Sequence, residues 1–165
     1  MNPVFSGKIA FIGGGNMAQA LIGGMVAQGV SAHRIMVAEP VEALRDILMQ
    51  RGLQVTADNQ VAVTEADVVV LAVKPQMMAE VLSGIAGQIE GRLVISIAAG
   101  LSVQALSSML GGYQRIIRAM PNTPALIQTG ATGLYAEADV GSNDRQQAEA
   151  VLGATGLVLW VDDEQ

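Results

Sequence analysis

Short apolar runs rich in β-branched residues alternate with helix-length segments along the whole chain. This alternation is typical of βαβ units, in which successive strands lie parallel and a helix crosses over between them. The run "DVVVLAV" at 67–73 is apolar without a break, as expected of a central parallel strand that helices cover on both faces. We therefore predict an α/β fold with a doubly wound, mostly parallel sheet and helices on both faces.

The boundaries of the expected elements follow from these runs and from the turn residues between them. Gly29 and Gly52 are expected just after helices, Ser102 at the start of one, and Pro40 in a helical first turn. The predicted strands are Lys8–Ile12, Arg34–Ala38, Leu53–Thr56, Val68–Ala72, Leu93–Ile97, Ile116–Ala119 and the final run "GLVLWV". The predicted helices are Met17–Gln28, Val41–Gln50, Gln76–Ser83, Val103–Leu110 and Asn143–Thr155. No composition shift marks a linker, so residues 1–165 are predicted to form one domain.

Composition limits the classes of protein to which this chain can belong. Hydrophobic residues make up 51% of the 165 residues and charged residues 15%, so a large share of the chain must be buried. The absence of cysteine removes disulfides, thiolate metal sites and cysteine nucleophiles. The single histidine, His33, is predicted at the solvated amino end of the second strand. The chain therefore has few residues from which a catalytic triad could be built.

Charge and hydropathy argue against nucleic acid and membrane partners. Nine basic and 15 acidic residues give a net charge of −6, and the basic residues are scattered. No apolar run reaches the ~18 residues that cross a bilayer, and "MNPVFSGK" lacks the features of a signal peptide. The acidic residues show no metal-ligand spacing. We expect a cytoplasmic protein that binds no metal, nucleic acid or membrane.

The stretch "KIAFIGGGNMAQALIGG" joins the first strand to the first helix. Gly13, Gly15 and Ala18 fit the pattern G-x-G-x-x-G/A, in the strand-to-helix context that a dinucleotide fingerprint requires. Gly13 permits the sharp turn, Gly15 lets the backbone approach a pyrophosphate, and the N–H groups of the helix start face the phosphates. Asn16 adds a side-chain donor. The alternative interpretation is a glycine-rich turn without a ligand.

Charged and small residues follow the second, fourth and fifth strands. Glu39 stands where such folds contact the adenosine ribose, which favours NAD, although Arg45 is near enough to compensate and Glu39 could be a solvated strand end. The turns "AVKPQ" and "SIAAG" place small residues at the carboxyl ends of central strands, where open α/β sheets bind ligands. Lys74 either lends positive charge to a phosphate or extends into solvent.

The loop "RAMPNTPALIQTG" has two prolines that bracket Asn122 and Thr123. Such a loop is rigid. It either presents amide and hydroxyl groups to the nicotinamide or a substrate, or it is a proline-braced crossover. The residues alone favour neither interpretation.

The motifs together resemble the pyrroline-5-carboxylate reductases, over essentially the whole chain. In order they are "FIGGGNMAQA", "TADN", "LAVKPQ", "ISIAAGLS" and "IIRAMPNTPALIQTG". The resemblance implies an amino-terminal Rossmann domain that binds NADPH or NADH. It implies cofactor contacts, from pyrophosphate through adenosine to nicotinamide, at Ile12, Gly13, Gly14, Gly15, Asn16, Met17, Glu39, Asn59, Ala72, Val73, Lys74, Pro75, Ala98, Ala99, Gly100, Asn122 and Thr123.

The resemblance also implies an activity and two departures from the family. Family enzymes reduce 1-pyrroline-5-carboxylate to L-proline by hydride transfer to the C=N carbon, and their helical second domain, absent from this chain, builds a homo-oligomer. We therefore expect the isolated chain to be inactive, and we assign no catalytic residue within it. Glu39 replaces the small or basic residue that many relatives carry, which leaves the cofactor preference open. The alternatives are a non-catalytic dinucleotide-binding module and the cofactor domain of a β-hydroxyacid dehydrogenase-like oxidoreductase.

Overall fold

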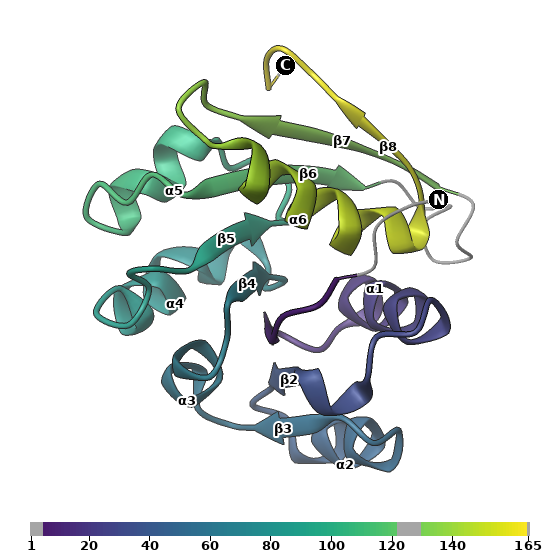
Figure 1. Ribbon diagram of the computed structural model, residues 1–165. Coiled ribbons are helices and arrows are strands. Elements are labelled where there is room, and N and C mark those ends of the chain that lie inside the picture. The colour runs from purple at the N-terminus through teal and green to yellow at the C-terminus, as the bar shows by residue number, and fades with distance from the viewer. Residues whose placement is uncertain (1–4, 122–129, 165) are drawn as a thin grey trace.

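The computed structural model describes residues 5–121 and 130–164, and these contain one eight-stranded sheet (Figure 1). The strand order is β3-β2-β1-β4-β5-β6-β7-β8, and every neighbouring pair is parallel except β6 and β7. The strands are β1 Ile9–Ile12, β2 Ile35–Ala38, β3 Gln54–Thr56, β4 Val68–Leu71, β5 Leu93–Ser96, β6 Ile116–Pro121, β7 Gly130–Ala136 and β8 Gly156–Trp160. The prediction of a doubly wound, mostly parallel sheet is confirmed.

Helices cover both faces of this sheet. In Figure 1, α1, α2 and α6 lie on one side and α3, α4 and α5 on the other. The α-helices are α1 Asn16–Ala27, α2 Glu42–Gln50, α3 Asn59–Thr64, α4 Met78–Ile85, α5 Val103–Met109 and α6 Ser142–Leu152. Short 3-10 turns are η1 Ala32–Arg34, η2 Pro75–Met77 and η4 Gly153–Thr155. None of the helices in the described ranges is long and apolar enough to cross a membrane.

The central strands are apolar at every position because each contributes to two cores. Along β4, Val68 and Val70 belong to the core beneath α1 and α6, whereas Val69 and Leu71 belong to the core beneath α4 and α5. All four side chains are fully buried. A slip of one residue would exchange the two sets, so the double burial fixes the register of the strand.

Most predicted elements are present, with boundaries moved by a few residues. Gly29 and Gly52 follow helices with φ values of +105° and +85°, and the Ser102 hydroxyl accepts a hydrogen bond from the N–H of Ala105 at 3.1 Å. The placement of Pro40 was wrong, because α2 begins at Glu42 and Pro40 lies outside its first turn. Two elements were not predicted, the helix α3 and the strand β7.

The helix α1 touches η4 through a glycine. A Cβ atom on the buried Gly24 would lie 2.3 Å from the carbonyl oxygen of Ala154, whereas one on the exposed Gly23 would meet nothing within 4 Å. This close approach sets the position of α1 relative to the β7–β8 side of the sheet.

We expect Gly24→Ala to destabilise the protein by about 1–3 kcal/mol, because the methyl group meets backbone that cannot move aside freely. The matched substitution Gly23→Ala should stabilise it by about 0.5–1 kcal/mol, since alanine is the better helix former in open space. Urea denaturation of both variants measures the difference. Equal effects of the two substitutions would contradict the packing described here.

Candidate functional site

The candidate site lies where the central parallel strands end. Three loops that follow β1, β4 and β5 meet there, namely Gly13–Gly15, Ala72–Pro75 and Ala98–Gly100. Backbone hydrogen bonds continue the ladder past the strand ends, from the N–H groups of Gly13, Ala72 and Ile97 to the oxygens of Ala38, Ile12 and Leu71 at 2.8, 2.9 and 3.1 Å. The structure therefore brings together turns that are far apart in the sequence, at the edge where open α/β sheets bind ligands.

The three glycines after β1 have different surroundings. Gly13 has a φ of +100°, and a Cβ atom there would lie 2.7 Å from the carbonyl oxygen of Ala72. Gly14 is buried, with Leu48 Cδ1 3.0 Å from the position of its missing Cβ. Gly15 is exposed, and a Cβ atom there would meet nothing within 4 Å. The first two glycines are required by the fold, whereas the third leaves open space beside the backbone.

The open space at Gly15 adjoins the amino end of α1. Gly15 is the N-cap residue, no side chain caps the helix there, and the first turn holds no acidic residue. The N–H groups of such a turn carry partial positive charge and lack helical partners. Asn16 is exposed at the first helical position, and Met17 is half-buried. This end of α1 suits an anionic group such as a phosphate.

Glu39 and Asn59 lie at the ends of neighbouring strands on one side of the glycine loop. Glu39 follows β2 and is only 8% exposed. Its carboxylate accepts hydrogen bonds from the N–H groups of Gly14 at 3.1 Å and Val41 at 2.9 Å. Asn59 is the half-buried first residue of α3, which follows β3. The inward direction of the Glu39 carboxylate was not predicted.

The remaining predicted residues extend the edge on the other side of the loop. Lys74 is exposed and directly precedes η2, in which Pro75 is the first residue. Ala99 and Gly100 are exposed, and Gly100 has a φ of +78°. The predicted residues with described positions are thus Ile12 to Met17, Glu39, Asn59, Ala72 to Pro75 and Ala98 to Gly100, whereas Asn122 and Thr123 lie outside the described residues.

Two titratable groups with displaced pKa values, Tyr113 and Arg115, lie at the amino end of β6, at the other edge of the sheet from the candidate site. Burial raises the pKa of Tyr113, and a hydrogen bond to Asp144 raises the pKa of Arg115. Arg115 immediately precedes β6 and donates to both carboxylate oxygens of Asp144, at 3.0 and 2.9 Å. Arg115 and Asp144 form a structural ion pair with Tyr113 nearby, and all three lie away from the candidate site.

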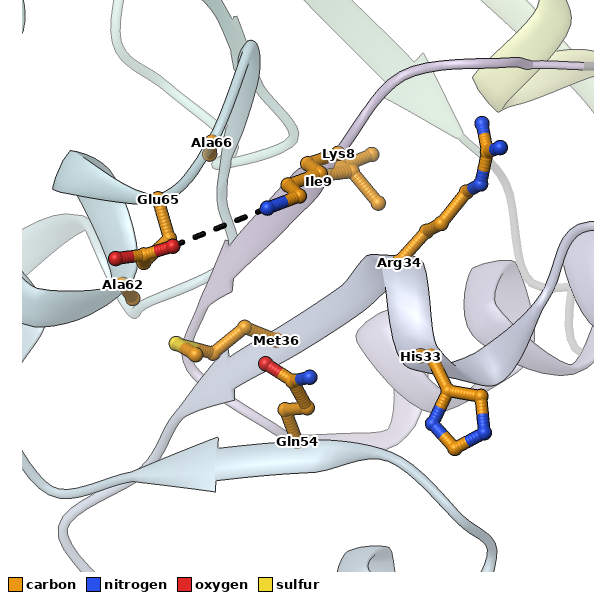
Figure 2. A pocket seen from close by; sticks show the side chains of 9 residues that line it. All are labelled: Lys8, Ile9, His33, Arg34, Met36, Gln54, Ala62, Glu65 and Ala66. Atoms are coloured by element: carbon orange, nitrogen blue, oxygen red, sulfur yellow. Dashed lines mark ion pairs between the residues drawn. The ribbon is translucent and has the colours of Figure 1, made fainter.

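The single histidine is one of the residues that line a small hollow at the amino end of the sheet (Figure 2). Its volume is about 30 Å³, which suits one water molecule and no cofactor. Lys8 and Glu65 form an exposed ion pair across it at 3.9 Å, and His33 lies apart from this pair. His33 is exposed, as predicted. Among the described residues no group of three His, Asp or Glu side chains could hold a metal ion.

The contrast between Gly13 and Gly15 predicts different costs of a methyl group. We expect Gly13→Ala to destabilise the protein by about 2–4 kcal/mol, because a positive φ and a collision with backbone add together. Gly15→Ala should cost only about 0.5–1 kcal/mol, because alanine is a poorer N-cap than glycine but its methyl group meets no atom. Chemical denaturation of the two variants tests this difference, and a similar loss in both would refute it.

Comparison with known proteins agrees with this geometry. Residues 8–100 match the family model described as NADP oxidoreductase, coenzyme F420-dependent. The chain is 46% identical over 159 residues to pyrroline-5-carboxylate reductase of Pseudomonas aeruginosa and 45% identical over 157 residues to that of Haemophilus influenzae. These matches include 95% and 94% of this chain, respectively, and 58% of the length of each relative.

Solved structures give the same result. A pyrroline-5-carboxylate reductase from Coxiella burnetii matches with a TM-score of 0.92 and 40% identity, over 96% of this chain and 60% of that one. The Plasmodium falciparum pyrroline carboxylate reductase with NADP bound matches with a TM-score of 0.84 and 25% identity, over 97% of this chain and 59% of that one. The chain spans about three-fifths of the length of these relatives. It belongs to the NADP oxidoreductase, coenzyme F420-dependent family, and within it resembles the pyrroline-5-carboxylate reductases.

Proposed function

We propose that this chain is the cofactor-binding domain of a pyrroline-5-carboxylate reductase. The observation that carries the proposal is the open approach to Gly15 at the uncapped start of α1, on the carboxyl edge of the sheet. The names of the relatives at 45–46% identity supply the reaction, reduction of 1-pyrroline-5-carboxylate to L-proline. The dinucleotide is NADPH or NADH.

The residues at the edge divide between the two ends of the cofactor. Gly15, Asn16 and Met17 hold the pyrophosphate through the N–H groups of the first turn of α1. Glu39 and Asn59 stand at the adenosine end. The small residues of Ala72–Pro75 and Ala98–Gly100 let the backbone approach the middle of the cofactor. For the nicotinamide we propose contacts from Asn122 and Thr123, on the resemblance to the family alone.

The chemistry is hydride transfer, which the bound dinucleotide supplies. The hydride goes to the C=N carbon and a proton goes to the nitrogen, so the imine becomes a secondary amine. A cyclic imine protonates readily, which makes its carbon electrophilic without a metal. The protein therefore contributes mainly the alignment of donor and acceptor carbons.

The chain divides this work with other parts of the enzyme. It spans 58% of its curated relatives, and we assign no acid at the described edge as a proton donor. We propose that substrate contacts, the proton donor and the contacts of a homo-oligomer come from outside these 165 residues, and that the enzyme acts in the cytoplasm.

Substitution of Gly15 tests the phosphate site. In calorimetric titration, Gly15→Val should weaken binding of both NADPH and NADH by at least about tenfold, because a branched side chain fills the space beside the loop. Gly23→Val, two turns further along α1 in open space, should leave binding unchanged. Normal binding by Gly15→Val would show that the loop is only a turn.

The activity itself is tested by oxidation of NADPH or NADH in the presence of 1-pyrroline-5-carboxylate. We expect turnover by the full-length enzyme, and binding without turnover by the 165-residue chain. Turnover of a β-hydroxyacid in place of the imine would contradict the proposed reaction. Binding without any turnover by the full-length enzyme would identify a non-catalytic module.

A further inference from the structure

The carboxylate of Glu39 is turned into the protein, towards the glycine loop. Oε1 accepts a hydrogen bond from the N–H of Gly14 at 3.1 Å, and Oε2 accepts one from the N–H of Val41 at 2.9 Å. The side chain is only 8% exposed. A single carboxylate thus joins the loop after β1 to the segment that leads into α2.

The backbone of Glu39 is held on both sides. Its N–H donates to the carbonyl oxygen of Thr56 at 2.9 Å, which ties the end of β2 to the end of β3. Its own carbonyl oxygen and that of Pro40 accept hydrogen bonds from Nη1 of Arg45 at 2.8 and 2.9 Å. The carboxylate is therefore presented from a fixed turn.

The hydrogen bond to Glu39 determines what the glycine loop can offer a ligand. The N–H of Gly14 points inward to Oε1 and is used there. Leu48 and Val37 lie 3.0 and 3.1 Å from the position of a Cβ atom on Gly14, so this residue packs against the interior. With Gly14 fixed inward, the next residue, Gly15, faces open space.

We propose that Glu39 is a positioning residue for the glycine loop and does not select NADH over NADPH. This inference rests on the proposed function, in which the loop holds the pyrophosphate. Both carboxylate oxygens accept charge-assisted hydrogen bonds from backbone, which offset the negative charge and order the loop. Because NADH and NADPH share the pyrophosphate, loss of the carboxylate weakens both in the same proportion.

Glu39→Gln tests this role. The amide keeps the size of the side chain but offers one acceptor in place of two, and its NH2 group faces a backbone N–H. We expect hydrogen exchange at the Gly14 and Val41 amides of the ligand-free chain to rise at least about tenfold. The dissociation constants for NADH and NADPH should both rise roughly tenfold, with their ratio changed by less than about threefold.

Asp144→Asn is the matched control. Asp144 is also a buried carboxylate, at 9% exposed, and pairs with Arg115 near the amino end of β6. Its substitution removes a charged pair without touching the loop. We expect it to lower the stability while exchange at Gly14 and Val41 and both affinities stay at their wild-type values.

If Glu39→Gln does not fold, Glu39→Asp provides a second test. The aspartate keeps the charge but is one methylene shorter, so it cannot reach both amides. Faster exchange at one of the two amides, with a smaller equal loss of both affinities, would support the proposal.

Two results would overturn it. Unchanged exchange at Gly14 and Val41 in the variants would show that the carboxylate does not hold the loop. Weaker NADH binding together with tighter NADPH binding would show that Glu39 selects the cofactor. Absence of dinucleotide binding by the wild-type chain would instead refute the proposed function, and the exchange measurement, which needs no ligand, would still decide whether Glu39 orders the loop.

Discussion

The double burial of the central parallel strands is the constraint on which the rest of the structure depends. Each strand sends alternate side chains into two separate cores, so none can slip without exchanging one core for the other. The backbone ladder therefore ends at fixed points, and its last hydrogen bonds reach into the loops at Gly13, Ala72 and Ile97. The loops of the site therefore begin at strand ends whose register is fixed.

The central part of this fold could be predicted from the sequence because burial there leaves an unambiguous pattern. The unbroken apolar run at 67–73, which contains β4, and the glycines after β1 have few alternative interpretations. The helix α3 escaped prediction because its six residues, "NQVAVT", favour a strand, and it forms where Asp58 caps it and Ala62 and Val63 pack into the core. The strand β7 contains two glycines and depends on its pairing with β6.

The candidate site, like the fold, could be predicted from the sequence only in part. The residue types at the strand ends, such as glycine and alanine, indicated a ligand edge because topology alone brings those ends together. The orientation of Glu39 could not be predicted, because a carboxylate at the end of β2 satisfies the same sequence pattern whether it faces solvent or the N–H of Gly14. What decided it was the inward packing of a neighbouring loop, which depends on Leu48 in another helix.

The contact between Gly24 and Ala154 has a consequence for the order of events in folding. These residues are far apart in the sequence, yet their backbones touch. Contacts of such long sequence separation form late, because the loop between them must close first. During synthesis, α1 can form as soon as its own residues leave the ribosome. It can pack in its final position only after η4 has been made. The position of α1, the helix that begins at the glycine loop, thus depends on residues that are translated long after its own.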